Sequence, residues 1–205
     1  MNSVIAFKPS ALEKRTIKPP KRRENAKLRS REHLTETEVT ALMEAARKNR
    51  DGKRDATMIL MAYRHGLRAS ELVDLRWEQI SFNHAVLHVR RAKNGTPATH
   101  PLTGKELRAL RDLKRESQSP FVFVSMRGAP FTVSGFRRLV ERATEMAGLE
   151  IKAHPHSLRH ACGYALANKG TDTRTIQAYL GHRNISNTVR YTELSTARFK
   201  GLFHD

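Results

Sequence analysis

The chain has 205 residues, enough to bury the core of one domain, and it carries 38 Lys or Arg against 20 Asp or Glu. The formal net charge of +18 requires a polyanionic partner, of which nucleic acid is the first candidate. No segment approaches the ~20 consecutive apolar residues of a membrane span, and the first residues lack the apolar core of a signal peptide. The single cysteine, Cys162, excludes an internal disulfide and is typical of a reducing compartment, which predicts a cytoplasmic protein.

Residues 1–31 form the most basic segment of the chain. They hold ten Lys or Arg and two Glu, and Pro9, Pro19 and Pro20 interrupt them. Because this segment shows no sustained hydrophobic period, we expect a disordered arm in the free protein, one that follows DNA phosphates without reading base sequence. The arm residues expected to contact DNA are Lys21, Arg22, Arg23, Lys27, Arg29 and Arg31.

A folded domain is expected over residues 32–205, beginning with a helix. Thr35 and Glu38 form a capping-box pattern, which predicts a helix to about Arg47. A second helix is predicted over residues 56–65, stopped by Gly66.

A short third helix is predicted to begin at Ser70. Arg68 therefore lies in the tight connection between two helices, where side chains are aimed at a ligand rather than buried. Residues 85–91 read as a strand, and Asn94-Gly95 is a strong hairpin signal, so residues 98–102 should return antiparallel with Lys93 at the tip.

The second half of the chain is predicted to be mostly helical. Residues 121–125 (FVFVS) read as a third strand between helices. Helix caps and stop glycines predict helices over 103–115, 132–147, 157–168, 173–180 and from 186 onward. The caps are Thr103, Thr132, Asp172 and Ser186, and the stops are Gly148, Gly170 and Gly181. The predicted fold class is mainly α with one small antiparallel sheet (α+β).

Breaking a DNA strand without a metal or a nucleotide sets a short list of chemical requirements. Negative charge gathers on the non-bridging phosphate oxygens in the transition state, and planar guanidinium groups suit these oxygens. Imidazoles supply donors and proton acceptors near neutral pH. A nucleophile must attack in line, and the departing alkoxide must receive a proton. The side chains that could meet these needs are Arg68, Lys93, His156, Arg159, His182 and Tyr191.

Each of these residues alone carries little information. An arginine among 38 basic residues is usually a surface charge, and a tyrosine is usually an amphipathic core residue. The order Arg, Lys, His-x-x-Arg, Leu-Gly-His, Tyr, with each member on a loop or at a helix end, is far more specific.

In that order the chain resembles the tyrosine recombinases of the phage integrase family. The matching segments are YRHGLRASEL (63–72), RRAKNG (90–95), HPHSLRHACGYALA (154–167) and YLGHRNISNTVRYT (179–192). The resemblance covers roughly residues 33–203 and is strongest to the short invertases that switch fimbrial promoters. It implies the tyrosine-recombinase catalytic-domain fold and a site-specific DNA recombinase that needs no metal, ATP or other cofactor. The implied outcome is inversion, or integration and excision, of a DNA segment.

The resemblance also implies which groups react. Tyr191 would attack the scissile phosphate, form a 3′-phosphotyrosyl bond and release a 5′-hydroxyl. His156 would accept the proton of the tyrosine, and Lys93 would protonate the leaving 5′ oxygen. An unperturbed tyrosine titrates near ~10, and nearby positive charge is expected to favour its phenolate.

The remaining implied roles are to hold and orient. Arg68 and Arg159 would bind the non-bridging oxygens, and His182 would donate a hydrogen bond to the phosphate. Glu71 would orient the site, and His160, four residues after His156, would support it.

Two features depart from the larger members of the family. Those proteins usually carry an N-terminal DNA-clamping domain of on the order of a hundred residues. Only the basic arm and one helix precede the helices around Arg68, so we expect a full core-binding domain to be lacking and DNA affinity to depend on the arm. In relatives the tail after the tyrosine packs on a neighbouring subunit. The apolar tail residues here could do so or could complete their own core; they are Leu194, Phe199, Leu202 and Phe203.

The resemblance implies partners as well: double-stranded DNA at specific recombination sites, a homo-tetramer on paired sites, accessory DNA-bending proteins and no membrane. Such a protein would associate with the nucleoid. The target sequence cannot be read from the chain, because base readout depends on a few side chains in the grooves.

Four other interpretations compete. A zinc site at His154, His156, His160 and Cys162 lacks a second ligand pair at the usual spacing, and Cys162 is expected to be a small core residue. A metal-dependent nuclease would need clustered carboxylates, which are scattered here, so no metal site is expected. A type IB topoisomerase would use the same residue types, and a non-catalytic DNA-binding regulator could keep the fold without cleaving.

Overall fold

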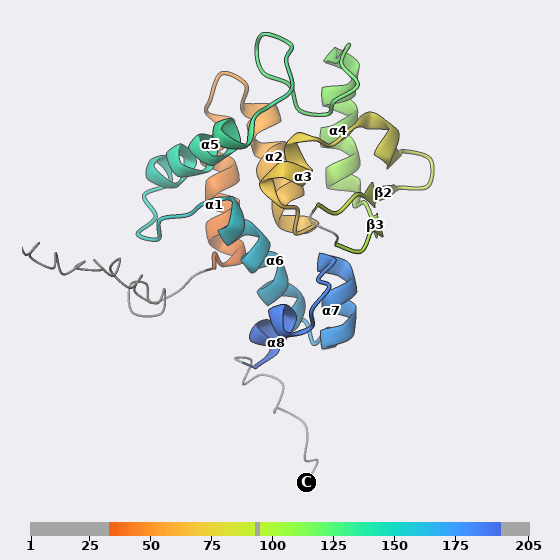
Figure 1. The fold of residues 1–205 in the computed structure, drawn as a ribbon. Helices are drawn as coiled ribbons and strands as arrows, with labels where there is room; N and C mark the ends of the chain where they lie inside the picture. Colours follow the sequence, from red (N-terminus) through yellow and green to blue (C-terminus); the bar gives the residue numbers. More distant parts are fainter. Residues whose placement is uncertain (1–32, 93–94, 194–205) are drawn as a thin grey trace, which may run out of the picture. The chain divides into compact units, whose positions relative to one another are not determined.

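A computed structural model describes residues 33–92 and 95–193, and within them it forms a mainly helical fold with one small antiparallel sheet (Figure 1). The predicted fold class is therefore confirmed. The predictions for the basic arm, for Lys93 and for the apolar tail residues lie outside the described residues.

Helix α2 (Gly52–Arg64) is the centre of the core. Every residue from Ala56 to Tyr63 is buried, because α1 (Glu36–Arg47), α4 (Gly104–Glu116) and α6 (Pro155–Asn168) all pack against it. The helix begins four residues earlier than predicted, since its first turn is polar and gives no hydrophobic period.

Local signals placed most helix ends correctly. The Thr35 backbone N–H donates to Glu38 Oε2 at 2.8 Å, and the Glu38 N–H donates to Thr35 Oγ1 at 3.2 Å, which completes the predicted capping box of α1. The glycines predicted to stop helices all have positive φ, between 55° and 79°; they are Gly66, Gly148, Gly170 and Gly181.

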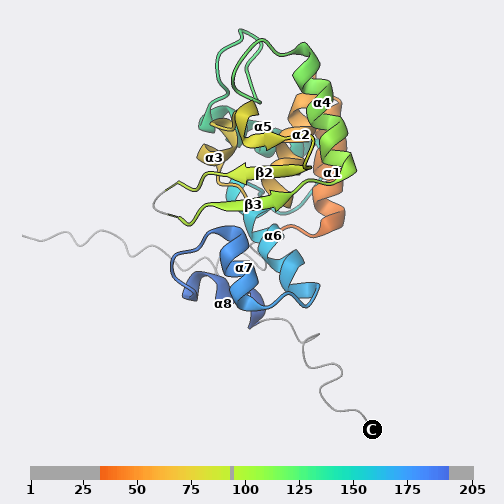
Figure 2. The same ribbon diagram turned by 90° about the vertical axis from the view of Figure 1, so that its right-hand side faces the viewer.

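The other helices are α3 (Ala69–Val73), α5 (Val133–Met146), α7 (Thr173–Leu180) and α8 (Ser186–Thr192). The predicted cap of α8 was wrong: Ser186 is the first helical residue, and its N–H donates to Asn184 Oδ1 at 2.9 Å. Helices α6, α7 and α8 pack on one another, and α7 also contacts strand β3 (Figure 2). This places the ends of α2, α6 and α7 beside the hairpin.

The sheet contains β1 (Ile80–Ser81), β2 (Val86–Val89) and β3 (Ala98–Pro101) in the order β1-β2-β3, all antiparallel. In the register of the predicted hairpin, Leu87 pairs with His100 and Val89 with Ala98. The hairpin prediction is confirmed.

The third predicted strand, over residues 121–125, was wrong. Phe121 and Val124 form only isolated bridges, to Arg76 and Pro130. Val122 and Phe123 are instead buried in the core, so this apolar run fills space rather than pairing in a sheet.

No helix in the described part of the chain is long and apolar enough to cross a bilayer.

Candidate active site

Arg68 and Glu71 are fixed to each other at the start of α3. Arg68 is the N-cap residue; its N–H donates to Glu71 Oε2 at 2.9 Å, and its Nη1 donates to Glu71 Oε1 at 2.6 Å. Burial alone would raise the pKa of Glu71, but the bonds from Arg68 and the charge of Arg91 hold that pKa below its usual value. Glu71 is therefore an anion that orients Arg68, whose side chain remains 26% exposed.

Arg159 reaches the same place from α6 but is almost completely buried, at 1% exposure. Its Nη1 donates to the carbonyl of Gly66, and its Nη2 donates to the carbonyl of Leu180 at 2.7 Å. Leu180 is the last residue of α7, and Gly66 lies just beyond the end of α2, so the negative ends of both helix dipoles favour a cation here. Burial, with the positive charges of Arg68 and Arg91, lowers the pKa of Arg159 to about 10, so the group stays charged at neutral pH.

Tyr191 is buried inside the protein, with an exposed fraction of 2%. Its ring lies against Gly163 of α6 so closely that a Cβ there would stand 2.7 Å from two ring atoms. Its hydroxyl lies 3.0 Å from His160 Nδ1. Burial raises the pKa of Tyr191 to about 12, although Arg159 and Arg190 oppose that shift. The positive charges favour the phenolate, as expected, but in the protein without DNA the loss of water on burial has the larger effect on the pKa.

Two histidines, His160 and His182, lie beside the tyrosine, and a third, His156, packs against His160. His160 is buried. The exposed His156 packs edge-on against the His160 ring, with 4.3 Å between the two ring centroids. The His182 ring lies 6.3 Å from that of Tyr191, and its Nδ1 lies 2.9 Å from Thr188 Oγ1. Thr188 thus leaves the other ring nitrogen of His182 available to a ligand.

All three imidazoles are neutral at neutral pH. Loss of water, and after it the positive charge of neighbouring groups, lowers the pKa of His156 and His182 to about 4 and that of His160 to about 3. Water at the exposed edge of His156 screens part of this effect. His160, rather than His156, holds the tyrosine hydroxyl in this state.

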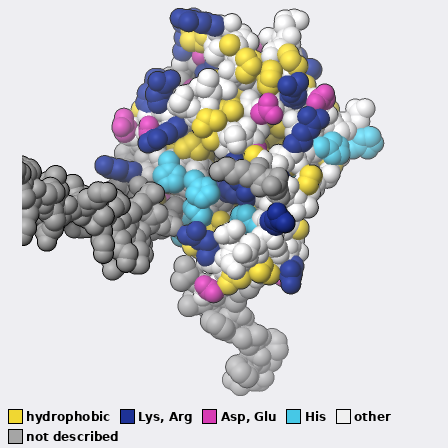
Figure 3. Space-filling model, viewed as in Figure 1, with side chains coloured by type: hydrophobic (Ala, Val, Ile, Leu, Met, Phe, Trp, Pro, Cys, Tyr) yellow, Lys and Arg dark blue, Asp and Glu magenta, His cyan; other side chains and the backbone are white. Residues whose placement is uncertain are grey.

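A cavity of about 580 Å³ opens in front of Arg68 and His182. Arg174 and Arg183 also line it, which gives it three guanidinium groups and a size suited to a phosphodiester. On the face seen in Figure 3, histidine side chains gather near the centre with Lys and Arg side chains around them. The opening is thus a strongly basic recess.

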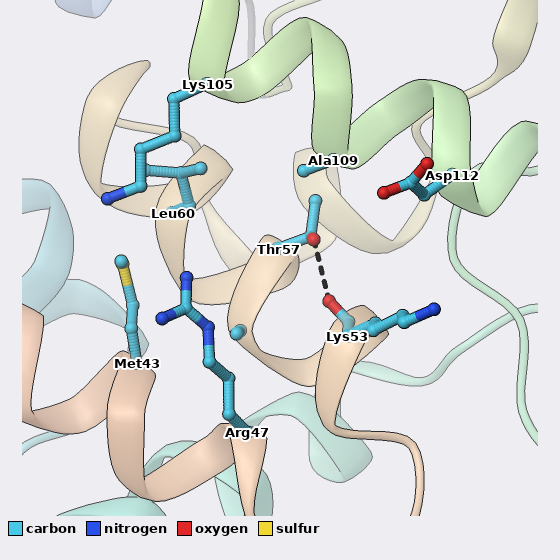
Figure 4. A pocket seen from close by; sticks show the side chains of 9 residues that line it. Met43, Arg47, Lys53, Thr57, Leu60, Lys105, Ala109 and Asp112 are labelled. Atoms are coloured by element: carbon cyan, nitrogen blue, oxygen red, sulfur yellow. Dashed lines mark hydrogen bonds between the residues drawn. The ribbon is translucent and has the colours of Figure 1, made fainter.

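A second cavity, of about 380 Å³, lies between α1, α2 and α4 (Figure 4). Its floor includes Met43 and Leu60, and Arg47, Lys53 and Lys105 stand at its edge. None of the predicted site residues lines it.

Most of the predicted site residues come together. Arg68, Arg159, His156 and His182 lie close enough to perturb one another's protonation, and Tyr191 lies beside them. Within the described residues, no three His, Cys, Asp or Glu side chains are arranged to bind a metal ion. Cys162 is buried in the core, as predicted.

Sequence reasoning missed Arg91, which is buried beside Glu71. A signal for it existed: Leu87 and Val89 point inward, and strand alternation points residue 91 the same way. A basic residue at an inward position needs a buried partner.

In comparison with known proteins, the phage integrase family matches residues 32–198 of this chain. The chain belongs to the phage integrase family, and its class is that of the tyrosine-type site-specific recombinases, as predicted.

The relatives include short fimbrial proteins. Type 1 fimbriae regulatory protein FimE of Escherichia coli (strain K12) is 44% identical over 180 residues, which cover 84% of this chain and 91% of FimE. FimB of the same strain is 39% identical over 181 residues, covering 85% of this chain and 90% of FimB. The crystal structure of XerA recombinase matches with a TM-score of 0.71 at 26% identity over 82% of this chain, and the match spans 62% of the XerA chain.

Proposed function

We propose that this protein cuts and rejoins double-stranded DNA through a covalent bond between Tyr191 and a 3′ phosphate. The observation that carries the proposal is the recess lined by Arg68 and His182, with the buried Arg159 close enough to Arg68 for their charges to interact and Tyr191 beside His182. Two guanidinium groups of fixed position match the two non-bridging oxygens of a phosphodiester. Structures of lambda integrase and XerH, which share this fold, were solved bound to DNA.

The cleavage step needs no reactant other than the protein and the DNA. The Tyr191 oxygen bonds to phosphorus while the bond to the 5′ oxygen breaks, so a phosphotyrosyl diester and a 5′-hydroxyl form. The phenol proton goes to His156, a neutral and exposed imidazole, and Lys93 gives a proton to the departing oxygen. Arg68, Arg159 and His182 bind the phosphate throughout, with Glu71 and His160 in support. The reverse attack by a 5′-hydroxyl of the partner strand reseals the DNA.

A nicked suicide substrate tests this proposal. Once the short 5′ fragment diffuses away, religation fails, and an SDS-resistant protein–DNA adduct should accumulate. Tyr191→Phe should abolish the adduct but keep DNA binding, whereas Tyr164→Phe, a tyrosine whose ring packs edge-on against Tyr191, should retain it. Adduct formation by Tyr191→Phe, or none by the unsubstituted protein on DNA that it binds, would rule the mechanism out.

The similarity to FimE and FimB supports inversion of a regulatory DNA segment as the outcome. We place four copies on two paired sites, aided by DNA-bending proteins, at the nucleoid. A plasmid with two inverted sites tests inversion: a changed restriction pattern supports it, while relaxation of a plasmid lacking the sites would favour topoisomerase activity instead. The mass of the protein–DNA assembly in solution tests the tetramer.

The basic arm, residues 1–31, is proposed to hold DNA phosphates. Its ten Lys or Arg would release counterions on binding, so deleting the arm should weaken the salt dependence of affinity. Measuring the dissociation constant against salt for both chains checks this. Equal slopes would show that the arm does not touch phosphates.

A further inference from the structure

Arg91 is a buried arginine to which the proposed reaction gives no role. Its side chain, just after β2, is 0% exposed. Its Nη1 donates to Glu71 Oε2 at 3.0 Å, and its Nη2 donates to the carbonyls of His65, at 3.2 Å, and Tyr179. A single guanidinium thus joins the hairpin, the end of α2 and the end of α7.

Close packing fixes this guanidinium in place. A Cβ at Gly181 would lie 2.8 Å from Arg91 Cγ, and a Cβ at Gly95 would lie 2.8 Å from Arg91 Cβ. The arginine is therefore pressed between the hairpin and the C-cap of α7, immediately before His182.

The charges around Glu71 do not cancel in pairs. One carboxylate accepts bonds from two guanidinium groups, Arg68 and Arg91, and Arg159 lies near both. The four groups together carry a net charge of +2. Without Arg91 the Glu71 carboxylate would be left to neutralise Arg68, which lines the recess.

We propose that Arg91 is a positioning residue that neutralises Glu71, so that Arg68 keeps its positive charge for the scissile phosphate. The proposal rests on the proposed function. It predicts that the contribution of Arg91 depends on the charge of the phosphate, which a role in packing alone would not.

The test compares two suicide substrates in single-turnover adduct formation. One carries the natural scissile phosphodiester; the other carries a methylphosphonate, in which a methyl group replaces one non-bridging oxygen and removes the negative charge. The variants are Arg91→Met and Arg91→Gln, with Arg91→Lys as the conservative substitution. Arg90→Met is the control, because Arg90 is 69% exposed and pairs with Glu78 at the surface. The ratio of the two rates within one variant is independent of its folded fraction.

Arg91→Met and Arg91→Gln should slow cleavage of the phosphodiester by about 10- to 100-fold, less than the ~10²–10³ for losing a direct oxyanion donor. Cleavage of the methylphosphonate should slow far less. The rate on the methylphosphonate divided by the rate on the phosphodiester should therefore rise about tenfold. Arg91→Lys and Arg90→Met should keep the ratio of the unsubstituted protein. Equal slowing on both substrates would overturn the proposal, whereas absence of any adduct with the unsubstituted protein would count against the proposed function instead.

The double variant Glu71→Gln with Arg91→Met guards against misfolding of the single variants. It removes both charges, so no carboxylate remains to neutralise Arg68. Its rate ratio should return to within about threefold of that of the unsubstituted protein, since the lost interaction was electrostatic. A ratio as high as that of Arg91→Met would contradict the charge-balancing role.

Discussion

The two halves of the active site are built in opposite ways. The arginine half is assembled without DNA: Arg159 is held by helix-end carbonyls, and Arg68 is held by Glu71 with its side chain partly exposed to the recess. The tyrosine half is closed, because Tyr191 is buried and its hydroxyl lies against His160.

This difference separates binding from reaction. Arg68, held by Glu71 and open to the recess, can bind a phosphate with little reorganisation, which favours electrostatic catalysis. A phenol with its pKa raised to about 12 by burial is a poor nucleophile until DNA changes its surroundings. Under the proposed function, we expect the protein to bind DNA before its nucleophile is exposed, which would limit cleavage at chance phosphates.

Replacing the two arginines should have the largest effect and should separate their roles. Arg159→Met and Arg68→Met should each slow adduct formation by about 10²–10³. Only Arg159→Met should also destabilise the fold strongly, by about 2–4 kcal/mol, because it leaves the Gly66 and Leu180 carbonyls without their donor. Adduct kinetics and urea unfolding measure the two effects. Equal losses of stability would contradict the view that Arg159 is the structural member of the pair.

Gly163→Ala tests whether the Tyr191 ring is buried against α6. The new methyl group would overlap the Tyr191 ring, so the fold should lose about 1–3 kcal/mol in urea unfolding. In a Tyr191→Ala background the same change should instead stabilise α6 by up to ~1 kcal/mol, since alanine favours a helix over glycine. The same cost in both backgrounds would mean that the ring does not occupy this position.

The buried histidines should make the fold sensitive to acid. The pKa values of His160 and His100 are lowered, by burial first, to about 3, whereas an unfolded histidine titrates near ~6.5. Below about pH 6.5 the unfolded chain therefore binds protons that the folded protein does not, and stability falls as pH falls toward 3. Each group should remove up to ~2 kcal/mol by pH 5.

Urea unfolding at about pH 7.5 and pH 5 measures this loss. His160→Gln and His100→Gln should each flatten the pH dependence, while His84→Gln, at an exposed turn position, serves as the control. A pH dependence unchanged by His160→Gln would mean that this ring is protonated in the folded protein.

The sequence predicted the fold correctly where the signals for it are local. Capping boxes and stop glycines lie within one turn of the helix ends that they set, so Thr35 and Gly66 marked those ends correctly. The segment over residues 121–125 misled, because a buried loop and a strand share the same apolar pattern and only tertiary packing distinguishes them.

The sequence predicted which residues form the candidate site better than it predicted the contacts between them. The order of Arg68, Arg159 and Tyr191 in the sequence predicted a set of residues that lie close to one another in the structure. The contact of Tyr191 with His160 depends on how α8 packs against α6, and the burial of Arg91 depends on its distant partner Glu71. No local pattern encodes either.

The central claim, that Tyr191 is stored until DNA binds, can be measured directly with 3-fluorotyrosine and fluorine NMR. Tyr191→Phe assigns the resonance, and Tyr63 and Tyr179 serve as internal references, because the ring of Tyr164 packs against Tyr191. Without DNA, the Tyr191 resonance should be insensitive to a soluble paramagnetic reagent; on a duplex that carries the recombination site, it should shift while those of Tyr63 and Tyr179 stay in place. A Tyr191 resonance that is already exposed to the reagent in the free protein, or one that DNA leaves unchanged while adducts form, would contradict the account.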